Sequence, residues 1–593
     1  MTEPYKIRLN TADFAVLTSA VFTIAREMGV NMERTARAPI YFSAHDFCTS
    51  ILTTDAELVA LAEYIPVLVG ATPFAVRAVN EYFRDDINPG DVFLVNDPYT
   101  MDAGNQMADW CVVYPVFHEK EHILWIANKA HQQDTGGGVP GGYNPNAIDV
   151  YAEGLRIPPL RIRRKGRERR SVVNLLMTNV RIPDVQYSDL LSLIGAARVA
   201  EKRLDTLIRG YGEKTFRLFL EDLLAYGEFL MREEIAKIPD GKYHSEIHGA
   251  VEGSPSVVCD LTVAEDRLIV DFSKSGPMSP EFINSPVANT HSAVYQAILQ
   301  SLGRNLQVRC GGCYRPVEIR TQPGTITHAT FPATHGNCTN FVAKQIIEAV
   351  WTALAQVAPR DTPGGWGSIP YWVFSGVDPR RNEGYGSPDF QATASGAGAL
   401  WGVDGWSTNG PVICSGTLYY PEIEVCEGLY PMFWHRWEWA EDSAGPGQWR
   451  GGFGVHNEWE AIADSQPVYV NYAADPYDYD PSPAIEGGHR PPNNHKMLCM
   501  ADGRQVDNHE IRSSKFFALG KGDRVVDFVQ GGCGVGNPLD RDETAVQKDV
   551  RDGLVSIQSA KEHYGVVIDP ETLAVNVEET ASLRAERNRV SRS

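Results

Sequence analysis

The sequence predicts a strand-rich α+β protein with several helices, and two observations lead to this fold class. Short apolar runs such as 91–95 and 110–117 alternate with turn clusters, which is the pattern of strands joined by loops. The 593 residues also include 53 glycines and 37 prolines, which favour extended and irregular backbone over long helices. Apolar stripes at helical spacing occur between these runs, so we expect helices among the strand-rich regions.

The first apolar stripe predicts a helix over about 11–28. Asn10 can cap its start, and Gly29 is expected to end it. The same periodicity predicts further helices over about 188–238, with a break near 210–212, and over about 293–302 and 342–357.

Composition and patterning divide the chain into six segments. They are 1–187 (N-terminal helix and strand-rich region), 188–240 (helical hairpin), 241–357 (second α/β region), 358–410 (rich in Gly, Ala and Pro), 411–570 (strand-rich) and 571–593 (tail). The segment 358–410 has no helix or strand period, but tryptophans are spread through it. We therefore expect packed, extended backbone of the polyproline type there, in preference to a disordered linker.

The overall composition is that of a soluble globular protein, with 43% hydrophobic and 22% charged residues. A net charge of −21 disfavours attraction to nucleic acid or to anionic lipid. The most apolar window, 58–79, is broken by charged residues and prolines, and the N-terminus lacks the apolar core of a signal peptide. Ten scattered cysteines suit reduced thiols. We expect a cytoplasmic protein without nucleic-acid or membrane partners.

Two polar clusters stand at the ends of an apolar stretch. Gln106 and Asp109 precede it, and His131 and Asp134 follow it. The stretch 110–130 has the pattern strand, polar turn, strand, which is that of a hairpin. A hairpin would bring the two ends of the stretch together. Carboxylate, imidazole and amide groups would then meet in one pocket, where they could transfer protons.

Several common catalytic motifs are missing from the sequence. It has no GxxxxGK[ST] phosphate loop, no GxGxxG, no HExxH and no GxSxG. If the protein takes part in an ATP-driven reaction, another chain is expected to bind the ATP.

A metal-like spacing occurs elsewhere. Cys310-x2-Cys313 is followed by His335-x2-Cys338, which could form a tetrahedral zinc site. The alternative is that these are unpaired thiols in turns between strands.

The region 96–159 resembles the hydantoinase B/oxoprolinase family. Its runs NDPYTMDAGNQMAD, HQQDTGG and EGLRIPP follow the family patterns NDPYxGGTHLPD, HxxDxGG and EGLxIPP. The resemblance extends over about 6–567 and includes the runs DF at 46–47, VDFS at 270–273, PEIEVCE at 421–427, RGGFG at 450–454 and GGCGVGNPLDRD at 531–542.

The resemblance implies a subunit of an ATP-dependent complex. The partners would be an actin-like ATPase chain of the hydantoinase A type, which binds the ATP, and a small accessory subunit, and no biotin is expected. The complex would act on a small molecule, either carboxylating a ketone or hydrolysing a cyclic amide. For the fold, the resemblance implies β-sheets in a barrel-like arrangement beside a bundle of polyproline-type segments.

The resemblance also implies a set of site residues. Metal-using members hold a divalent ion (Zn, Mn or Mg) between the His and Asp of THLPD and the His of HxxD. Here Gln106 stands at the first His, while Asp109 and His131 match. An amide is a weaker ligand for a transition metal than an imidazole. Three arrangements remain open: a metal held by Asp46, Asp109 and His131, a metal-free site with His131 as general acid–base oriented by Asp109, or a structural pair that holds the hairpin.

Neighbouring residues would complete the site. Asp134 is included among the catalytic residues, and Arg156 could bind a carboxylate or phosphate through its planar fork. Gly136, Gly137 and Gly138 fit a close approach of backbone to a ligand, with N–H groups for an oxyanion, or else a flexible turn.

The loss of the first His favours one branch of the family. Acetophenone-type carboxylation, in which ketone, bicarbonate and ATP give a β-keto acid, is the chemistry that the resemblance associates with no ion at this position. The alternative is a subunit of a hydantoinase, 5-oxoprolinase or lactamase.

Overall fold

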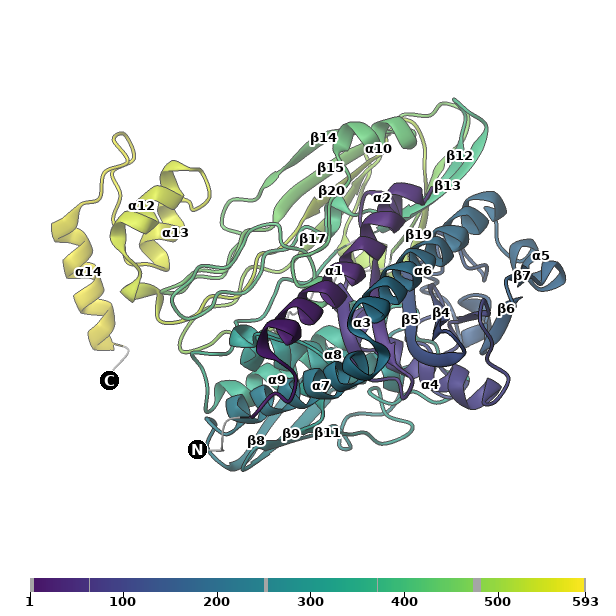
Figure 1. Cartoon of the computed structure of the whole chain (residues 1–593). Coiled ribbons are helices and arrows are strands. Elements are labelled where there is room, and N and C mark those ends of the chain that lie inside the picture. Colours follow the sequence, from purple (N-terminus) through teal and green to yellow (C-terminus); the bar gives the residue numbers. More distant parts are fainter. Residues whose placement is uncertain (1–4, 63, 250–253, 371, 473–481, 591–593) are drawn as a thin grey trace. The chain divides into compact units, whose positions relative to one another are not determined.

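The protein is described by a computed structural model, in which residues 5–62, 64–249, 254–370, 372–472 and 482–590 are placed (Figure 1). The chain forms two compact units. The first comprises Met1–His248, Ser254–Ala353 and Thr417–Pro421, and the second comprises Gly249–Gly253, Leu354–Gly416 and Glu422–Ser593.

The first unit contains an antiparallel seven-stranded sheet in the order β2-β1-β5-β4-β3-β6-β7. Its strands are β1 (Phe47–Thr53), β2 (Leu58–Ala62), β3 (Val92–Val95), β4 (Asp109–His118), β5 (Glu121–His131), β6 (Leu160–Arg164) and β7 (Arg167–Glu168). The hairpin expected over 110–130 is confirmed as β4 and β5, with Asp109 directly opposite His131.

A second, four-stranded sheet of this unit has the order β11-β10-β9-β8. Its strands are β8 (Gly241–Ile247), β9 (Val257–Ala264), β10 (Arg267–Asp271) and β11 (Val317–Arg320).

The first unit also contains helices. They are α1 (Thr11–Thr35), α2 (Pro39–Phe42), α3 (Pro66–Val69), α4 (Thr72–Phe83), α5 (Arg170–Thr178), α6 (Pro183–Tyr211), α7 (Glu213–Ile235), α8 (Val287–Ser301) and α9 (Val342–Ala355). Helices α1 and α6 lie side by side (Figure 1) and contact β1 and β5. The predicted break near 210–212 is confirmed, because Gly212 separates α6 from α7 with a φ of 84°.

The start of α1 is confirmed and its predicted end is wrong. The Asn10 side chain accepts hydrogen bonds from the N–H groups of Ala12 and Asp13. The helix then continues through Gly29 to Thr35. A Cβ atom at Gly29 would overlap the ring of Tyr64, so this glycine allows a close helix contact and does not end the helix.

The second unit contains two more sheets, in the orders β13-β12-β16-β19 and β14-β15-β20-β17-β18. The first consists of β12 (Trp372–Asp378), β13 (Glu383–Pro388), β16 (Val468–Tyr472) and β19 (Phe516–Leu519). The second consists of β14 (Met432–Trp439), β15 (Val455–Ala461), β17 (His495–Cys499), β18 (Gln505–Val506) and β20 (Arg524–Phe528).

One apolar core joins these two sheets, with Trp372, Trp434 and Trp459 buried in it. Within the described residues each sheet has two open edges, so the barrel-like arrangement is not confirmed, whereas the expected strand-rich mixture of helices with several antiparallel sheets is.

The Gly-rich segment 358–410, apart from residue 371, contains the strands β12 and β13, which its lack of a strand period did not predict, and its other parts are mostly buried, irregular backbone. Gly452 donates its N–H to Ala397, and Ala399 donates its N–H to Cys533, so distant extended segments are hydrogen-bonded to one another. A Cβ atom at Gly398 would overlap backbone atoms, which explains the glycine content. The expectation of ordered backbone in place of a linker is confirmed.

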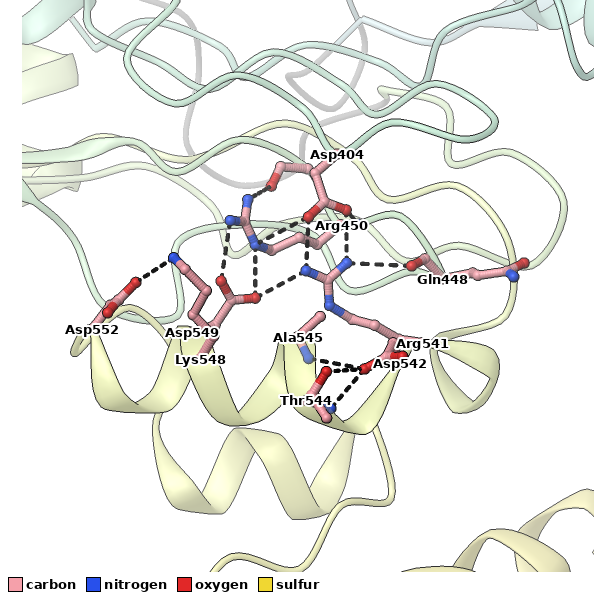
Figure 2. Close-up of polar contacts among 11 residues, drawn as sticks. Asp404, Gln448, Arg450, Arg541, Asp542, Thr544, Ala545, Lys548, Asp549 and Asp552 are labelled. Carbon is pink, nitrogen blue, oxygen red and sulfur yellow. Dashed lines mark hydrogen bonds and ion pairs between the residues drawn. The ribbon is translucent and has the colours of Figure 1, made fainter. Parts of the chain in front are cut away.

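Short helices complete the second unit: α10 (Ile423–Leu429), α11 (Asn508–Ser514), α12 (Glu543–Arg551), α13 (Ile557–Glu562) and α14 (Val577–Val590). Two arginines and two aspartates fix α12 to the extended segments (Figure 2). Arg541 binds both oxygens of Asp404 at 2.7 Å, and Arg450 and Arg541 each bind Asp549 at 3.0 Å.

The segment 571–593, which was expected to be a tail, contains the helix α14. No helix in the placed parts of the chain is long and apolar enough to cross a bilayer.

Candidate functional site

The seven-stranded sheet aligns polar side chains in two rows across β1, β5 and β4. Residues paired across antiparallel strands point to the same face of the sheet. The end row consists of Asp46, His131 and Asp109, and the second row of Cys48, Lys129 and Cys111. Asp46 lies just before β1 and joins the end row through its carbonyl, which accepts the N–H of His131 at 3.0 Å.

This face lies opposite the one covered by α1 and α6. Thr49 and Asn128 are each offset by one residue from the two rows, so they point to the opposite face. Their side chains donate hydrogen bonds to the carbonyls of Ala25 in α1 and Leu193 in α6. The two rows therefore face the other side of the sheet, where Ser50 contacts the start of α4. The sheet register thus places the candidate site residues together on one surface.

Three of the predicted residues meet in the end row. Asp109 Oδ1 lies 2.9 Å from Gln106 Nε2 and 3.0 Å from His131 Nδ1, and these two nitrogens are 3.1 Å apart. All three side chains are buried. We assign the Nδ1 proton to the bond with Asp109, because a carboxylate oxygen can only accept a hydrogen bond. His131 Nε2 is then the nitrogen left for a reacting group.

The charges in the end row influence one another. Burial lowers the pKa of His131, but the hydrogen bond to Asp109 and the nearby Asp46 outweigh it, so this pKa lies above its usual value. Burial raises the pKa of Asp46 to about 6, with His131 opposing and Asp109 reinforcing the shift. The row therefore favours a protonated imidazole held by carboxylate groups.

A buried lysine lies behind this row. Lys129 Nζ donates to Asn105 Oδ1, and Asn105 Nδ2 donates to Asp109 Oδ2 at 2.7 Å. Neither Lys129 nor Asn105 was predicted from the sequence as a site residue. The signal was present, because Lys129 precedes His131 by two positions in a strand and must share its face.

Two further predicted site residues, Arg156 and Asp134, form ion pairs with other side chains. The guanidinium of Arg156 binds Asp97 at 2.8 Å and lies over the ring of Phe331. Asp134 binds the guanidinium of Arg181 at 3.0 Å and accepts its backbone N–H at 2.7 Å. Each of these charges is already neutralised within the chain, so their proposed direct roles at the substrate stay predictions.

The glycine run is explained by packing against the loop 152–154. Gly136 and Gly137 have positive φ, and a Cβ atom at Gly137 would lie 2.8 Å from the backbone of Glu153. Gly138 donates its N–H to Ala152, and Gly136 donates to Asp134. Two of the three N–H groups expected to bind an oxyanion are thus used inside the protein, and ligand binding by this run stays a prediction.

The four residues of the zinc spacing do not form a metal-binding group. Cys310 and Cys313 pack together against Gly227 of α7. His335 lies beside Glu153, with Nδ1 3.0 Å from Oε2, and the Cys338 thiol donates to the carbonyl of Asn105. Sequence spacing suggested a cluster, but the chain between 313 and 335, which includes β11, leads the two halves to different neighbours.

The end row is a poor fit to a divalent ion. Nowhere in the described chain do three or more His, Cys, Asp or Glu side chains form a group that could hold a metal. Gln106 presents N–H to Asp109, and Asn105 occupies the second oxygen of that carboxylate. A cation needs lone pairs where this arrangement has hydrogen-bond donors. We therefore derive no chemical step through a metal.

The chain belongs to the hydantoinase B/oxoprolinase family, whose profile matches residues 10–538. Caprolactamase subunit beta of Pseudomonas jessenii is 35% identical to it over 95% of this chain and 97% of the relative. The crystal structure of ATP-dependent caprolactamase from the same organism superimposes with a TM-score of 0.89 and 33% identity, covering 98% of this chain and all of the other. The acetophenone carboxylase delta subunit of Aromatoleum aromaticum is 26% identical over 91% of this chain and 84% of the relative.

Proposed function

We propose that this protein is the non-ATPase subunit of an ATP-dependent cyclic amide hydrolase. The observation that supports this choice is the 35% identity, over nearly the whole of both chains, to a caprolactamase subunit. The carboxylase expected from the sequence rests on a relative at 26% identity. Similarity therefore favours the alternative of the two functions that the sequence left open.

The chemistry begins with a poor electrophile. An amide carbonyl resists water, and phosphorylation of its oxygen makes the carbon reactive and the oxygen a better leaving group. We assign the phosphorylation to an ATP-binding partner of the hydantoinase A type, because this sequence has no phosphate loop. This chain would then receive the phosphorylated ring.

His131 has the geometry for the next step. In the neutral form of His131 the Nδ1 proton is held by Asp109 at 3.0 Å, so Nε2 can accept a proton from an attacking water, and the raised pKa favours the imidazolium that results. The water oxygen bonds to the carbonyl carbon, and the C–N bond breaks as the ring nitrogen takes the proton from Nε2. A second water hydrolyses the acyl phosphate left behind, which yields the amino acid and phosphate. Asp109 stabilises the imidazolium formed in between.

The test is substrate turnover by the complex. The chain is co-expressed with its actin-like partner and incubated with ATP and, separately, caprolactam, 5-oxoproline or hydantoin. We expect one of these rings to open with release of ADP, measured by mass spectrometry. An active ATPase complex that opens none of them would contradict the proposal.

Ketone carboxylation stays the second candidate because of Gln106. This residue occupies the position of a metal-ligating His in the metal-using members, and it contacts both Asp109 and His131. Incubation with ATP, acetophenone and labelled bicarbonate distinguishes this function. Acid-stable label in a β-keto acid would support it, and its absence beside ring opening would exclude it.

A further inference from the structure

We propose that Lys129 supplies in this site the positive charge that a divalent ion supplies in metal-using members of the family. Lys129 would be a positioning residue, acting on Asp109 through Asn105. The inference rests on the proposed function only in placing the reaction at the end row. Its test measures metal binding by the chain itself, so it can fail or succeed independently of the substrate.

The first argument is the burial of Lys129. Its side chain has no exposed surface and lies in the row between the thiols of Cys48 and Cys111. In the described part of the chain it makes no ion pair, and its ammonium donates to an amide oxygen of Asn105. A buried cation without compensation costs several kcal/mol. The negative charges that compensate it are those of the end row, which lies two residues further along β5.

The second argument is the connection to Asp109. Asn105 accepts from Lys129 with its oxygen and donates to Asp109 Oδ2 with its nitrogen. The lysine therefore fixes the orientation of the amide, since the reverse orientation would point N–H groups at an ammonium. The carboxylate of Asp109 thus receives three N–H donors, from Asn105, Gln106 and His131.

The third argument is the proximity of like charge. Lys129 lies on the same face of the sheet as the end row, two residues from His131 along β5. A divalent cation added to the end row would therefore lie close to a buried ammonium group, which is strongly unfavourable.

The fourth argument is the position of the departures from the family pattern. Asn105 and Gln106 stand where THLPD has Thr and His. Both replacements direct N–H donors at Asp109, one at each oxygen. Gln106 thus stands at the position of a metal ligand, and Asn105 beside it connects the carboxylate to the buried ammonium.

The experiment compares cobalt binding by four full-length proteins: wild type, Gln106→His, Lys129→Met and the double variant. Co²⁺ gives visible absorption when nitrogen and oxygen side chains bind it. We expect no stoichiometric Co²⁺ in the wild type and about one per chain in the double variant. Gln106→His alone should bind at least about tenfold more weakly than the double variant, because Lys129 repels the ion.

A matched control separates the effect of the charge at Lys129 from the general effect of removing a buried lysine. Lys496 in β17 is also fully buried, and Lys496→Met should leave Co²⁺ binding unchanged. Lys129→Met should lower kcat more than it raises KM if Asp109 loses its orientation. Stoichiometric Co²⁺ in the wild type would overturn the inference, and so would equal affinity of the folded Gln106→His and double variants, as judged by circular dichroism.

Discussion

His131 is the residue on which the proposed chemistry depends most. Its ring lies in stacked orientation beside Tyr143, with centroids 5.4 Å apart, and its Nδ1 is fixed by Asp109. These two contacts define which ring nitrogen can exchange a proton with a substrate. The histidine is thus oriented before any ligand arrives, as a general acid–base requires.

Replacement of His131 tests this role. We expect His131→Ala to lower the rate of ring opening by about 10²- to 10⁴-fold, the usual contribution of a general acid–base. ATP hydrolysis by the partner should continue, because this chain is not assigned the nucleotide. The ratio of ring-opened product to ADP measures the difference. A protein that only assembles the complex would keep full activity in this variant.

A second histidine makes stability depend on pH. Burial lowers the pKa of His122 to about 4, although its bond to the Leu124 carbonyl opposes the shift. Between about pH 6.5 and 4 the unfolded chain takes up this proton and the native state does not, so stability falls as the pH falls. The loss is about 3 kcal/mol over that window.

Chemical denaturation at several pH values measures this effect. His122→Gln should flatten the dependence between pH 6.5 and 4, whereas replacement of the exposed His248 should leave it unchanged. An unaltered slope in the His122 variant would contradict the assignment.

At the level of elements, features that depend on local sequence patterns were predicted better than features that depend on long-range contacts. The alternation and polar turn of 110–130 were sufficient to predict β4 and β5, because both signals are contained in the hairpin. The end of α1 was not predictable, because Gly29 is selected by contact with Tyr64. Lys129 could be placed on the face of His131 from their spacing, but its contact with Asn105, 24 positions away in the sequence, could not be predicted.

The helix contact at Gly29 can be tested against a matched glycine. Gly29→Ala should destabilise the protein by about 1–3 kcal/mol, because the added methyl overlaps Tyr64. Gly210 in α6 has no atom near its Cβ position, so Gly210→Ala should stabilise by up to about 1 kcal/mol. Denaturant unfolding compares them, and equal effects would refute the packing explanation.

The ion cluster of Figure 2 predicts how the C-terminal helices are held. Arg541→Met leaves the charge of Asp404 without its bidentate partner and should cost about 3–5 kcal/mol. Hydrogen exchange in α12 should accelerate. Lys548→Met, on the same helix, removes only an exposed pair with Asp552 and should change little. Equal protection of α12 in both variants would show that the cluster does not fix this helix.

For the whole molecule, composition indicates less about the function than family membership does. The net charge of −21 and the average hydrophobic content exclude classes of protein without indicating a reaction. The hydantoinase B/oxoprolinase family, to which the chain belongs, includes a subunit of an ATP-dependent caprolactamase, and the identity to that subunit favours the proposed amide hydrolysis over carboxylation. The substrate could not be predicted from the sequence, because the choice between the two branches rested on a single position, Gln106.

The most direct measurement is turnover of caprolactam, 5-oxoproline and hydantoin by the complex of this chain with its ATPase partner. We predict that one ring opens only in the presence of ATP, with ADP formed in proportion to the amino acid product, and that His131→Ala abolishes the product. An intact complex that hydrolyses ATP, opens none of the three rings and instead converts acetophenone and bicarbonate to a β-keto acid would contradict the proposed function.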